Sequence, residues 1–302
     1  MRRDSSKMSK KIKVKKKFNP RRFVTNSVVH VLLTVLSVIW LFPVLWVILQ
    51  SFRVENNGYG SYTTYFFPKE LGFKNYIRLF TETDILNFPQ MFMNTLIIAI
   101  FTCIISTLFV LSVAYTMSRL RFKLRKTYLN LAMIMGLFPG FMSMVATYQI
   151  LKTLGLTEGE LVRVAMILVY AGGSGMGFYM AKGFFDTIPK SLDEAALIDG
   201  ATKFQVFTKV TMPLSKPIIV YTVLTSFMGP WLDFIFAKVL CRTQKEYYTV
   251  SIGLWNMLEK EYLYKYFTRF CAGAVLVSIP IATIFILMQK FYQDGMSGAV
   301  KG

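Results

Sequence analysis

The residues best suited to a specific interaction lie in one short polar segment, residues 191–213, with the sequence SLDEAALIDGATKFQVFTKVTMP. We call this stretch the hairpin segment. It combines a carboxylate, two adjacent alanines, a glycine and a closing proline, which are Glu194, Ala195, Ala196, Gly200 and Pro213. Small side chains let a partner backbone come close, as they do between packed helices. The pattern therefore favours docking of a partner over bond-making chemistry.

Local signals predict two short helices in the hairpin segment. Ser191 and Glu194 have the spacing of a capping box, which predicts a first helix starting at Leu192 and ending at a Gly200 cap. Thr202 and Gln205 repeat the capping pattern, so a second helix should follow and stop before Pro213. Glu194 has a simpler interpretation, in which it only caps a self-contained hairpin lying on a membrane surface.

The two helices should each present apolar side chains. On the first, Leu192 shares a face with Ala195 and Ala196. On the second, the pairs are Phe204 with Phe207 and Val206 with Val210. We expect one pair to face the rest of the chain and the other to face a partner.

Residues for enzyme chemistry are scarce in this sequence. His30 is the only histidine, and neither H-E-x-x-H nor G-x-S-x-G occurs. GGSGMG at residues 172–177 lacks the lysine of a phosphate-binding loop, so the chain should not be an ATPase itself. Cys103, Cys241 and Cys271 have neither disulfide nor metal spacing. We expect no catalytic residue, no bound metal and no cofactor on this chain.

The hairpin segment lies between apolar stretches that should cross a membrane. The chain of 302 residues is 54% hydrophobic, and a span needs roughly 20 mainly apolar residues. Six windows satisfy this length, and they are residues 28–49, 95–117, 128–151, 161–184, 217–240 and 267–288. The fold class should therefore be all-α, a polytopic membrane protein with six transmembrane helices.

The basic residues orient these spans. Of the 35 lysines and arginines, 23 fall on the side that holds both termini and the hairpin segment. The positive-inside rule places that side in the cytosol. The basic run at residues 10–17 also resembles a nucleic-acid patch, but directly before a span it is better explained as a topology signal that meets anionic lipid headgroups. We expect a lipid partner and no nucleic acid.

Several residues mark where a translocation pathway or a tight helix contact should lie. Prolines occur inside the predicted spans at Pro43, Pro139, Pro230 and Pro280, where the freed carbonyls need a neighbouring helix or a wet cavity. The pathway candidates are Pro230, Trp231 and Asp233. Asp233 lies either at membrane depth, where an ionisable group is functional by default, or at the interface. Gly173 and Gly177 form a small-xxx-small pair that should admit another helix.

Two outer segments are rich in aromatic residues. The longer one, residues 53–90, contains Tyr59, Tyr62, Tyr65, Phe66 and Phe67. The other, residues 241–265, adds Tyr247, Tyr248, Trp255 and Tyr262. Rings at a membrane boundary are ordinary anchors, which is the interpretation we favour over stacking on a sugar. Either segment is available to an extracellular partner.

The hairpin segment resembles the EAA motif of the membrane subunits of bacterial ABC importers. Glu194-Ala195-Ala196, Gly200 and Pro213 stand in its spacing, with Val-Thr-Met-Pro at residues 210–213 in place of the usual Ile-x-Leu-Pro. The resemblance runs from about Asn94 to the C-terminus and is strongest to carbohydrate permeases of the maltose and maltodextrin type. It is carried mainly by residues 188–202 and by the ending at residues 295–302.

This resemblance implies a type I ABC importer permease in the bacterial plasma membrane, with a second permease subunit, two ATPase subunits and an extracytoplasmic sugar-binding protein as partners. ATP and Mg would be used by the ATPases. The hairpin segment would dock on an ATPase, and the tail would reach between the two ATPases through Gly298, Ala299, Val300, Lys301 and Gly302.

The same likeness suggests how the chain is divided. We expect a cytosolic basic tail at residues 1–27, a first transmembrane helix at 28–50, an extracytoplasmic loop at 51–90, a five-helix core at 91–290 with a coupling loop at 186–216, and a cytosolic tail at 291–302.

The cargo and the class of transporter leave alternatives. The sugar implied is an oligosaccharide such as maltose or maltodextrin, while galactosides and polyol phosphates are other possibilities. An ion-coupled secondary transporter would need charged groups deep in its spans, which are scarce here. A membrane scaffold without a pore would not need the prolines.

Overall fold

The computed structural model describes residues 20–54, 66–83, 86–173, 177–260 and 262–299. The described residues are helical apart from turns, loops and one isolated β-bridge between Arg53 and Leu71. The chain divides into two compact units, residues 1–47 and 48–302. The expected all-α fold class is confirmed.

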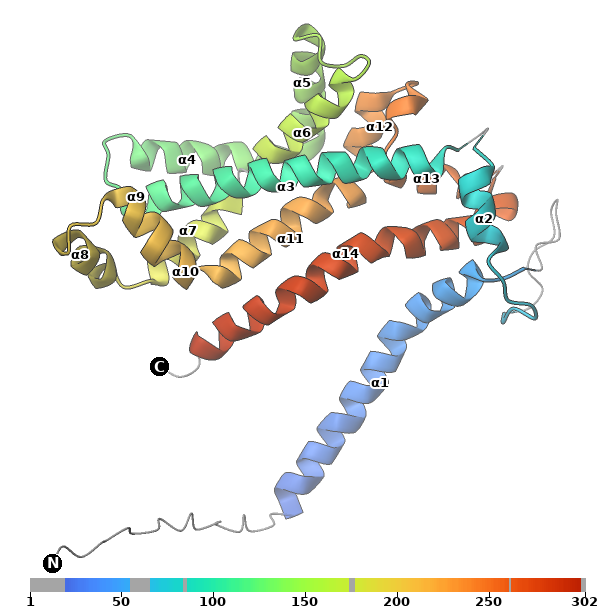
Figure 1. The fold of residues 1–302 in the computed structure, drawn as a ribbon, viewed down its shortest axis with the longest axis horizontal. Coiled ribbons are helices and arrows are strands. Elements are labelled where there is room, and N and C mark those ends of the chain that lie inside the picture. The colour runs from blue at the N-terminus through green and yellow to red at the C-terminus, as the bar shows by residue number, and fades with distance from the viewer. Residues whose placement is uncertain (1–19, 55–65, 84–85, 174–176, 261, 300–302) are drawn as a thin grey trace, which may run out of the picture. The chain divides into compact units, whose positions relative to one another are not determined.

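The helices are named as in Figure 1. They are α1 (Pro20–Ser51), α2 (Lys74–Thr81), α3 (Phe88–Arg119), α4 (Arg125–Gly136), α5 (Gly140–Thr153), α6 (Leu161–Gly173), α7 (Gly177–Thr187), α8 (Lys190–Ile198), α9 (Lys203–Gln205), the π-helix η2 (Val206–Thr211), α10 (Met212–Leu214), α11 (Lys216–Leu232), α12 (Ile235–Cys241), the 3₁₀-helix η3 (Lys245–Tyr247), α13 (Val250–Asn256) and α14 (Leu263–Ala299).

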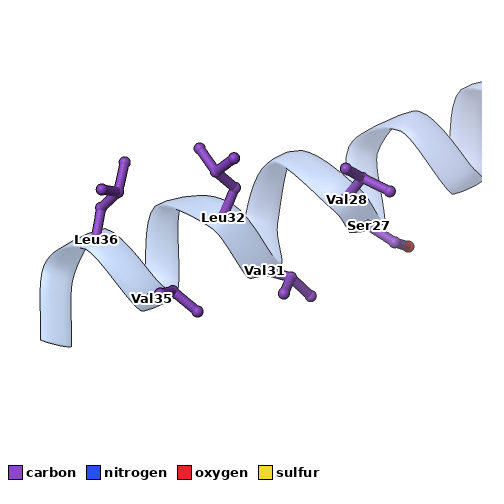
Figure 2. A pocket seen from close by; sticks show the side chains of 6 residues that line it. All are labelled: Ser27, Val28, Val31, Leu32, Val35 and Leu36. Atoms are coloured by element: carbon purple, nitrogen blue, oxygen red, sulfur yellow. The ribbon is translucent and has the colours of Figure 1, made fainter. Parts of the chain in front are cut away.

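The first unit contains most of α1, whose apolar residues recur at helical spacing. Figure 2 shows Ser27, Val28, Val31, Leu32, Val35 and Leu36 along α1, where they line an apolar hollow. Pro43 lies inside the same helix. A helix that is apolar over this length, from Thr25 to Ser51, is long enough to cross a bilayer.

The second unit is organised around α3. This helix packs against α11, α7 and α6, and α11 in turn packs against α14, so that α3, α11 and α14 run side by side in Figure 1. One core cluster forms at the end near α13, where Ile98 and Ala99 of α3 are buried with Ile252. A second cluster forms at the other end of α3, around Ala114 and Phe185.

The described part of the chain contains up to six candidate spans. Three are single helical stretches, Thr25–Ser51, Phe88–Arg119 and Lys265–Phe291, and three more arise if each bent helix pair counts as one. The pairs bend by 104° between α4 and α5, by 40° between α6 and α7, and by 84° between Lys203–Leu214 and α11. Pro139 caps α5 at the sharpest of these bends, while Pro230 and Pro280 lie inside α11 and α14.

The closest helix contacts involve glycines other than the predicted pair. A Cβ on Gly273 of α14 would lie 2.7 Å from Leu254 Cδ2, and a Cβ on Gly253 of α13 would clash with Met91. Gly173 has nothing within 4 Å of such a Cβ, and Gly177 has only an ordinary contact, at 3.8 Å, with Val110. Within the described part of this chain, no helix approaches Gly173 and Gly177 tightly, and the wall of α6 and α7 at this point lies beside a cavity. Close approach by another helix there stays a prediction.

A buried polar network closes the end of the second unit near α2. The amide of Asn75 donates to the carbonyls of Ser51 and Arg53 at 3.0 and 2.8 Å, and its oxygen accepts from Thr268 at 3.0 Å. Nearby, Glu82 pairs with Arg269 and accepts a hydrogen bond from Arg78 that, as the largest cause, lowers the pKa of its carboxyl. This network joins the end of α1 to α2 and α14.

Candidate functional site: the hairpin segment and a polar groove

The first helix of the hairpin segment begins earlier than the sequence pattern predicts. Helix α8 starts at Lys190 after Pro189, which is in an extended conformation and supplies no side-chain cap. Ser191 is then the second helical residue, so the predicted capping box with Glu194 is wrong. The physical reason is that proline fixes its own backbone angle and is readily followed by a helix, which shifts the start by two residues.

The end of α8 and the following turn agree with the prediction. Gly200 has a φ of +85°, a left-handed conformation that favours glycine. Its amide donates to the carbonyl of Leu197 at 3.1 Å, and the amide of Ala201 donates to that of Ala196 at 2.9 Å. These two bonds form a Schellman cap, which fixes the direction in which the chain leaves α8.

The second helix also starts as predicted but ends later. Thr202 and Gln205 form a reciprocal capping box, with bonds of 3.3 and 2.7 Å. The helix then passes through the π-helical stretch η2 and continues beyond Pro213 to Leu214. The expected stop before Pro213 is wrong, because the wider π turn changes the bonding register ahead of the proline.

A buried ion pair attaches α8 to the end of α3. Arg119 Nε lies 3.1 Å from Asp193 Oδ2, and the two side chains are only 4% and 13% exposed. Arg119 Nη2 also donates to the carbonyl of Ile188 at 2.9 Å. Beside it, the hydroxyl of Ser118 donates to Asp186 Oδ1 at 2.6 Å. The last turn of α3 thus bonds to residues both before and after the start of α8.

The second helix is attached to α3 one turn earlier. The hydroxyl of Tyr115 donates to the carbonyl of Lys203 at 3.3 Å, and its ring lies 4.6 Å from that of Phe207. Val206 is buried. The expected division between a phenylalanine pair and a valine pair is wrong, since Phe207 and Val206 both face the rest of the chain.

The opposite side of the hairpin segment is open. Glu194 and Ala195 are exposed, and Ala196 is half-buried. Two large apolar side chains stand out beside them, Ile198 at 86% and Phe204 at 72% exposure. One carboxylate and two alanines amid exposed apolar side chains make a surface that a second protein can cover.

The candidate residues of the tail lie partly outside the described residues. Gly298 and Ala299 are the last residues of α14. Val300, Lys301 and Gly302 lie beyond the described part of the chain.

A second feature is a groove of about 660 Å³ between α3, α6, α7, α11 and α12. We call it the polar groove. Its wall carries six hydroxyl-bearing residues, which are Thr102, Ser106, Tyr170, Tyr221, Thr225 and Ser226. Pro230 and Asp233 also line it, whereas Trp231 lies in the core against Phe92 and Phe227. The structure therefore brings two of the three pathway candidates to one cavity and leaves the third outside it.

Asp233 lies at a break between α11 and α12, within the fifth span predicted from the sequence. Helix α11 ends at Leu232 and α12 starts at Ile235. Asp233 Oδ1 accepts from the amide of Phe236 at 3.2 Å, and Oδ2 accepts from the hydroxyl of Tyr170 at 2.6 Å. The carboxylate thus satisfies an amide that the break would leave unpaired, and it does so at the wall of the groove.

Within the described ranges, no three His, Cys, Asp or Glu side chains gather closely enough to hold a metal ion.

Comparison with known proteins decides the family. Residues 111–298 match the family described as binding-protein-dependent transport system inner membrane component. The chain belongs to this family. Such a component is a non-catalytic membrane subunit that works with an ATPase and a substrate-binding protein.

Relatives of known function match almost the whole chain. The galactooligosaccharides transport system permease protein GanQ of Bacillus subtilis is 36% identical, over 93% of this chain and 98% of its own. The maltodextrin transport system permease protein MalD of Streptococcus pneumoniae is 34% identical, with the same coverage. The crystal structure of a bacterial ABC transporter involved in the import of alginate matches with a TM-score of 0.72 at 22% identity, over 92% of this chain and 100% of that chain. The type I ABC importer permease fold is thereby confirmed.

Two residues of this ABC permease that position the hairpin segment were missed in the sequence. Arg119 counts there only as one of the cations that orient the spans, and Tyr115 only as an apolar residue of the second span. A usable signal was present in Arg119, which lies two residues after the span predicted at residues 95–117 and has Asp193 as a possible acidic partner on the same side of the membrane.

The buried ion pair makes a testable prediction for the permease. Replacing Arg119→Met leaves Asp193 buried without its partner, so local opening of α8 should become easier by about 3–5 kcal/mol. Adding Asp193→Leu removes the unpaired charge and should restore most of that loss. Hydrogen exchange of the α8 amides in the purified transporter measures both changes.

The control is Glu160→Gln, which breaks the pair with Arg163 from its exposed side, since Glu160 is 82% exposed, and should change stability by less than about 1 kcal/mol. Unchanged exchange of α8 in Arg119→Met, or faster exchange in the double variant than in the single one, would contradict the role given to this pair.

Proposed function

We propose that this chain is one of two permease halves of an importer that carries an oligosaccharide into the cell. The single observation that carries the transport mechanism is the hairpin segment, which is anchored by buried contacts on one side and open on the other. A rigid anchor allows a force applied to the open side to reach α3 and α7. A flexible segment would instead rearrange internally and would not transmit the movement to these helices.

In this mechanism, the open side of the hairpin segment docks on an ATPase subunit. Glu194, Ala195 and Ala196 form the contact, and Gly200 fixes the turn behind it. Two ATPases close on ATP and Mg and open after hydrolysis, and the hairpin segment transmits that motion to the helices. The groove then alternates between outward and inward access, because a partner shifts a two-state equilibrium by its differential affinity for the two states.

The family and the charge pattern support the remaining partners and the orientation that we propose. The second half is a different permease subunit, so the membrane part is a heterodimer, and an extracytoplasmic sugar-binding protein delivers the cargo. Both termini and the hairpin segment face the cytosol of a bacterial cell, as the basic residues indicate. The tail from Gly298 to Gly302 lies near the ATPases.

The cargo is supported by the relatives. Two relatives, at 34% and 32% identity, are named as maltodextrin transport system permeases, and one at 36% identity is named as a galactooligosaccharides transport system permease. We propose an oligosaccharide such as maltodextrin, with a galactooligosaccharide as the second candidate. Uptake of both by cells with and without this chain decides between them.

Docking through Glu194 predicts a change in assembly. The ATPase should co-purify with the wild-type permease pair, and Glu194→Lys should abolish that association, because the reversed charge stands at the centre of the contact. Glu160→Lys makes the same charge change at an exposed site outside the hairpin segment and should leave the ATPase bound. Recovery of normal amounts of ATPase with Glu194→Lys would refute the docking role.

The cap at Gly200 predicts a change in coupling. A non-glycine residue in the left-handed region costs about 1–2 kcal/mol, and valine is worse because it is β-branched. Gly200→Val should therefore lower sugar-stimulated ATPase activity of the reconstituted importer by roughly 5–30-fold. Gly200→Asn, which tolerates this conformation, should stay close to wild type. Full activity of Gly200→Val would count decisively against the proposed coupling.

A further inference from the structure

We propose that a hollow between α3 and α4 binds the phosphate headgroup of one anionic phospholipid. The hollow has a volume of about 490 Å³ and is lined by four cations and two apolar residues, which are Arg121, Phe122, Lys123, Arg125, Lys126 and Leu129. We call it the cationic hollow. It lies between the end of α3 and the start of α4 (Figure 1). It shares no lining residue with the polar groove or the hairpin segment, so its ligand is distinct from both the cargo and the ATPase.

The four cations of the cationic hollow lack acidic partners. Among the described residues, none of the four forms an ion pair with a carboxylate. Arg125 acts through space on Asp186, but the two oxygens of Asp186 already accept from Ser118 and Lys182, each at 2.6 Å. Like charges around one hollow repel one another. A bound anion would therefore stabilise this arrangement.

Two features at the start of α4 also lack a negative partner. Arg125 Nε is buried and has no hydrogen-bond partner among the described residues. Leu124, which precedes α4, has no side-chain acceptor for the first amides, and the first turn of α4 contains no acidic residue. The free amides at a helix N-terminus carry partial positive charge and favour an anion. The oxygens of a phosphate group can accept from the guanidinium and from these amides.

The cationic hollow is held between two anchored helix ends. The hydroxyl of Tyr179 in α7 donates to the carbonyl of Leu129, and the ring of Tyr128 lies 6.1 Å from that of Phe178. On the other side, the last turn of α3 is held by the buried ion pair of Arg119. The loop between α3 and α4 is thus fixed at both ends. A preformed site loses less conformational freedom when its ligand binds.

The surroundings of the cationic hollow favour a lipid over a soluble anion. One candidate span, Phe88–Arg119, ends directly before the hollow, and the helix pair that begins at Arg125 is another candidate. A hollow between two such span ends lies at the level of the lipid headgroups. Phe122 and Leu124 are exposed beside it, and Leu131 is exposed further along α4. Apolar side chains next to a cationic site suit acyl chains that continue from a phosphate.

The positive-inside rule explains why cations lie on this side of the membrane. It depends on the number of cations and not on how they are arranged. Here four of them surround one hollow together with a buried donor that has no partner among the described residues. Orientation and lipid binding also differ in a measurable way, because only lipid binding requires these particular cations.

The test uses the two permeases and the ATPases in liposomes of phosphatidylcholine with a minority of phosphatidylglycerol. A photoreactive benzoylphenylalanine takes the place of Phe122, which lines the hollow and is exposed. Each lipid is radiolabelled in turn. The measured quantity is the ratio of crosslinked phosphatidylglycerol to crosslinked phosphatidylcholine, per mole of each lipid present. This ratio should be well above one.

Arg121→Gln combined with Lys126→Gln removes two cations of the hollow and leaves the half-buried Arg125 in place. The ratio should fall about tenfold or more, as expected when two basic residues near an anionic lipid are lost. Lys123→Gln with Lys126→Gln is a second pair with the same expected fall. Lys203→Gln with Lys209→Gln is the matched control, because it removes the same charge from two exposed lysines outside the hollow. It should leave the ratio unchanged.

Four outcomes would overturn the lipid site. They are equal crosslinking of the two lipids, an unchanged ratio in both pairs of hollow variants, an equal fall in the control pair, and crosslinking to an ATPase subunit in place of a lipid. An excess of inorganic phosphate distinguishes the source of the anion. Crosslinking of phosphatidylglycerol should persist in its presence, and complete loss would assign the hollow to a soluble anion and overturn the lipid.

Discussion

The ion pair between Arg119 and Asp193 sets the position of the hairpin segment, and most of the proposed mechanism depends on that position. Two charges that are almost completely shielded from water cost several kcal/mol each to desolvate, and only their mutual attraction and added hydrogen bonds offset this cost. The pair therefore holds only while Asp193 stays in place, so α8 and the end of α3 move together.

The rest of the hairpin segment extends this constraint. Its Schellman cap at Gly200 and its capping box at Thr202 leave a short, bonded turn between two helices. Tyr115 of α3 hydrogen-bonds to the second helix, and Arg119 of α3 forms the ion pair with the first. With its other side packed against α3 in this way, the segment leaves Glu194, Ala195 and its large apolar side chains Ile198 and Phe204 exposed. The structure thus supports a rigid lever with one free face.

At the groove, the same logic of satisfied backbone groups applies. A helix can be interrupted within a membrane protein only where neighbouring groups or a wet cavity satisfy the freed amides and carbonyls. Asp233 meets this requirement by accepting the amide of Phe236, and the interruption opens beside hydroxyl-bearing side chains.

Local signals in the sequence predicted much of this arrangement, and contacts between distant residues were beyond it. The helix cap at Gly200 and the capping box of Thr202 with Gln205 depend only on residues a few positions apart in the sequence, and both were predicted correctly. The start of α8 was missed because Pro189 overrides the weaker serine signal. The partner of Arg119 could not be assigned, since its choice depends on how α8 folds back onto α3. Trp231 and Asp233 are two residues apart, yet the helix break and the turn of α11 send one into the core and the other to the groove.

The central claim is that the hairpin segment faces the cell interior, where an ATP-driven partner can bind it. A cysteine at Ile198, the most exposed large apolar side chain of the segment, tests it directly with a membrane-impermeant thiol reagent. The claim predicts labelling in inverted membrane vesicles and none in right-side-out vesicles, with a variant lacking this cysteine unlabelled in both. Labelling of Ile198→Cys only in right-side-out vesicles would contradict it.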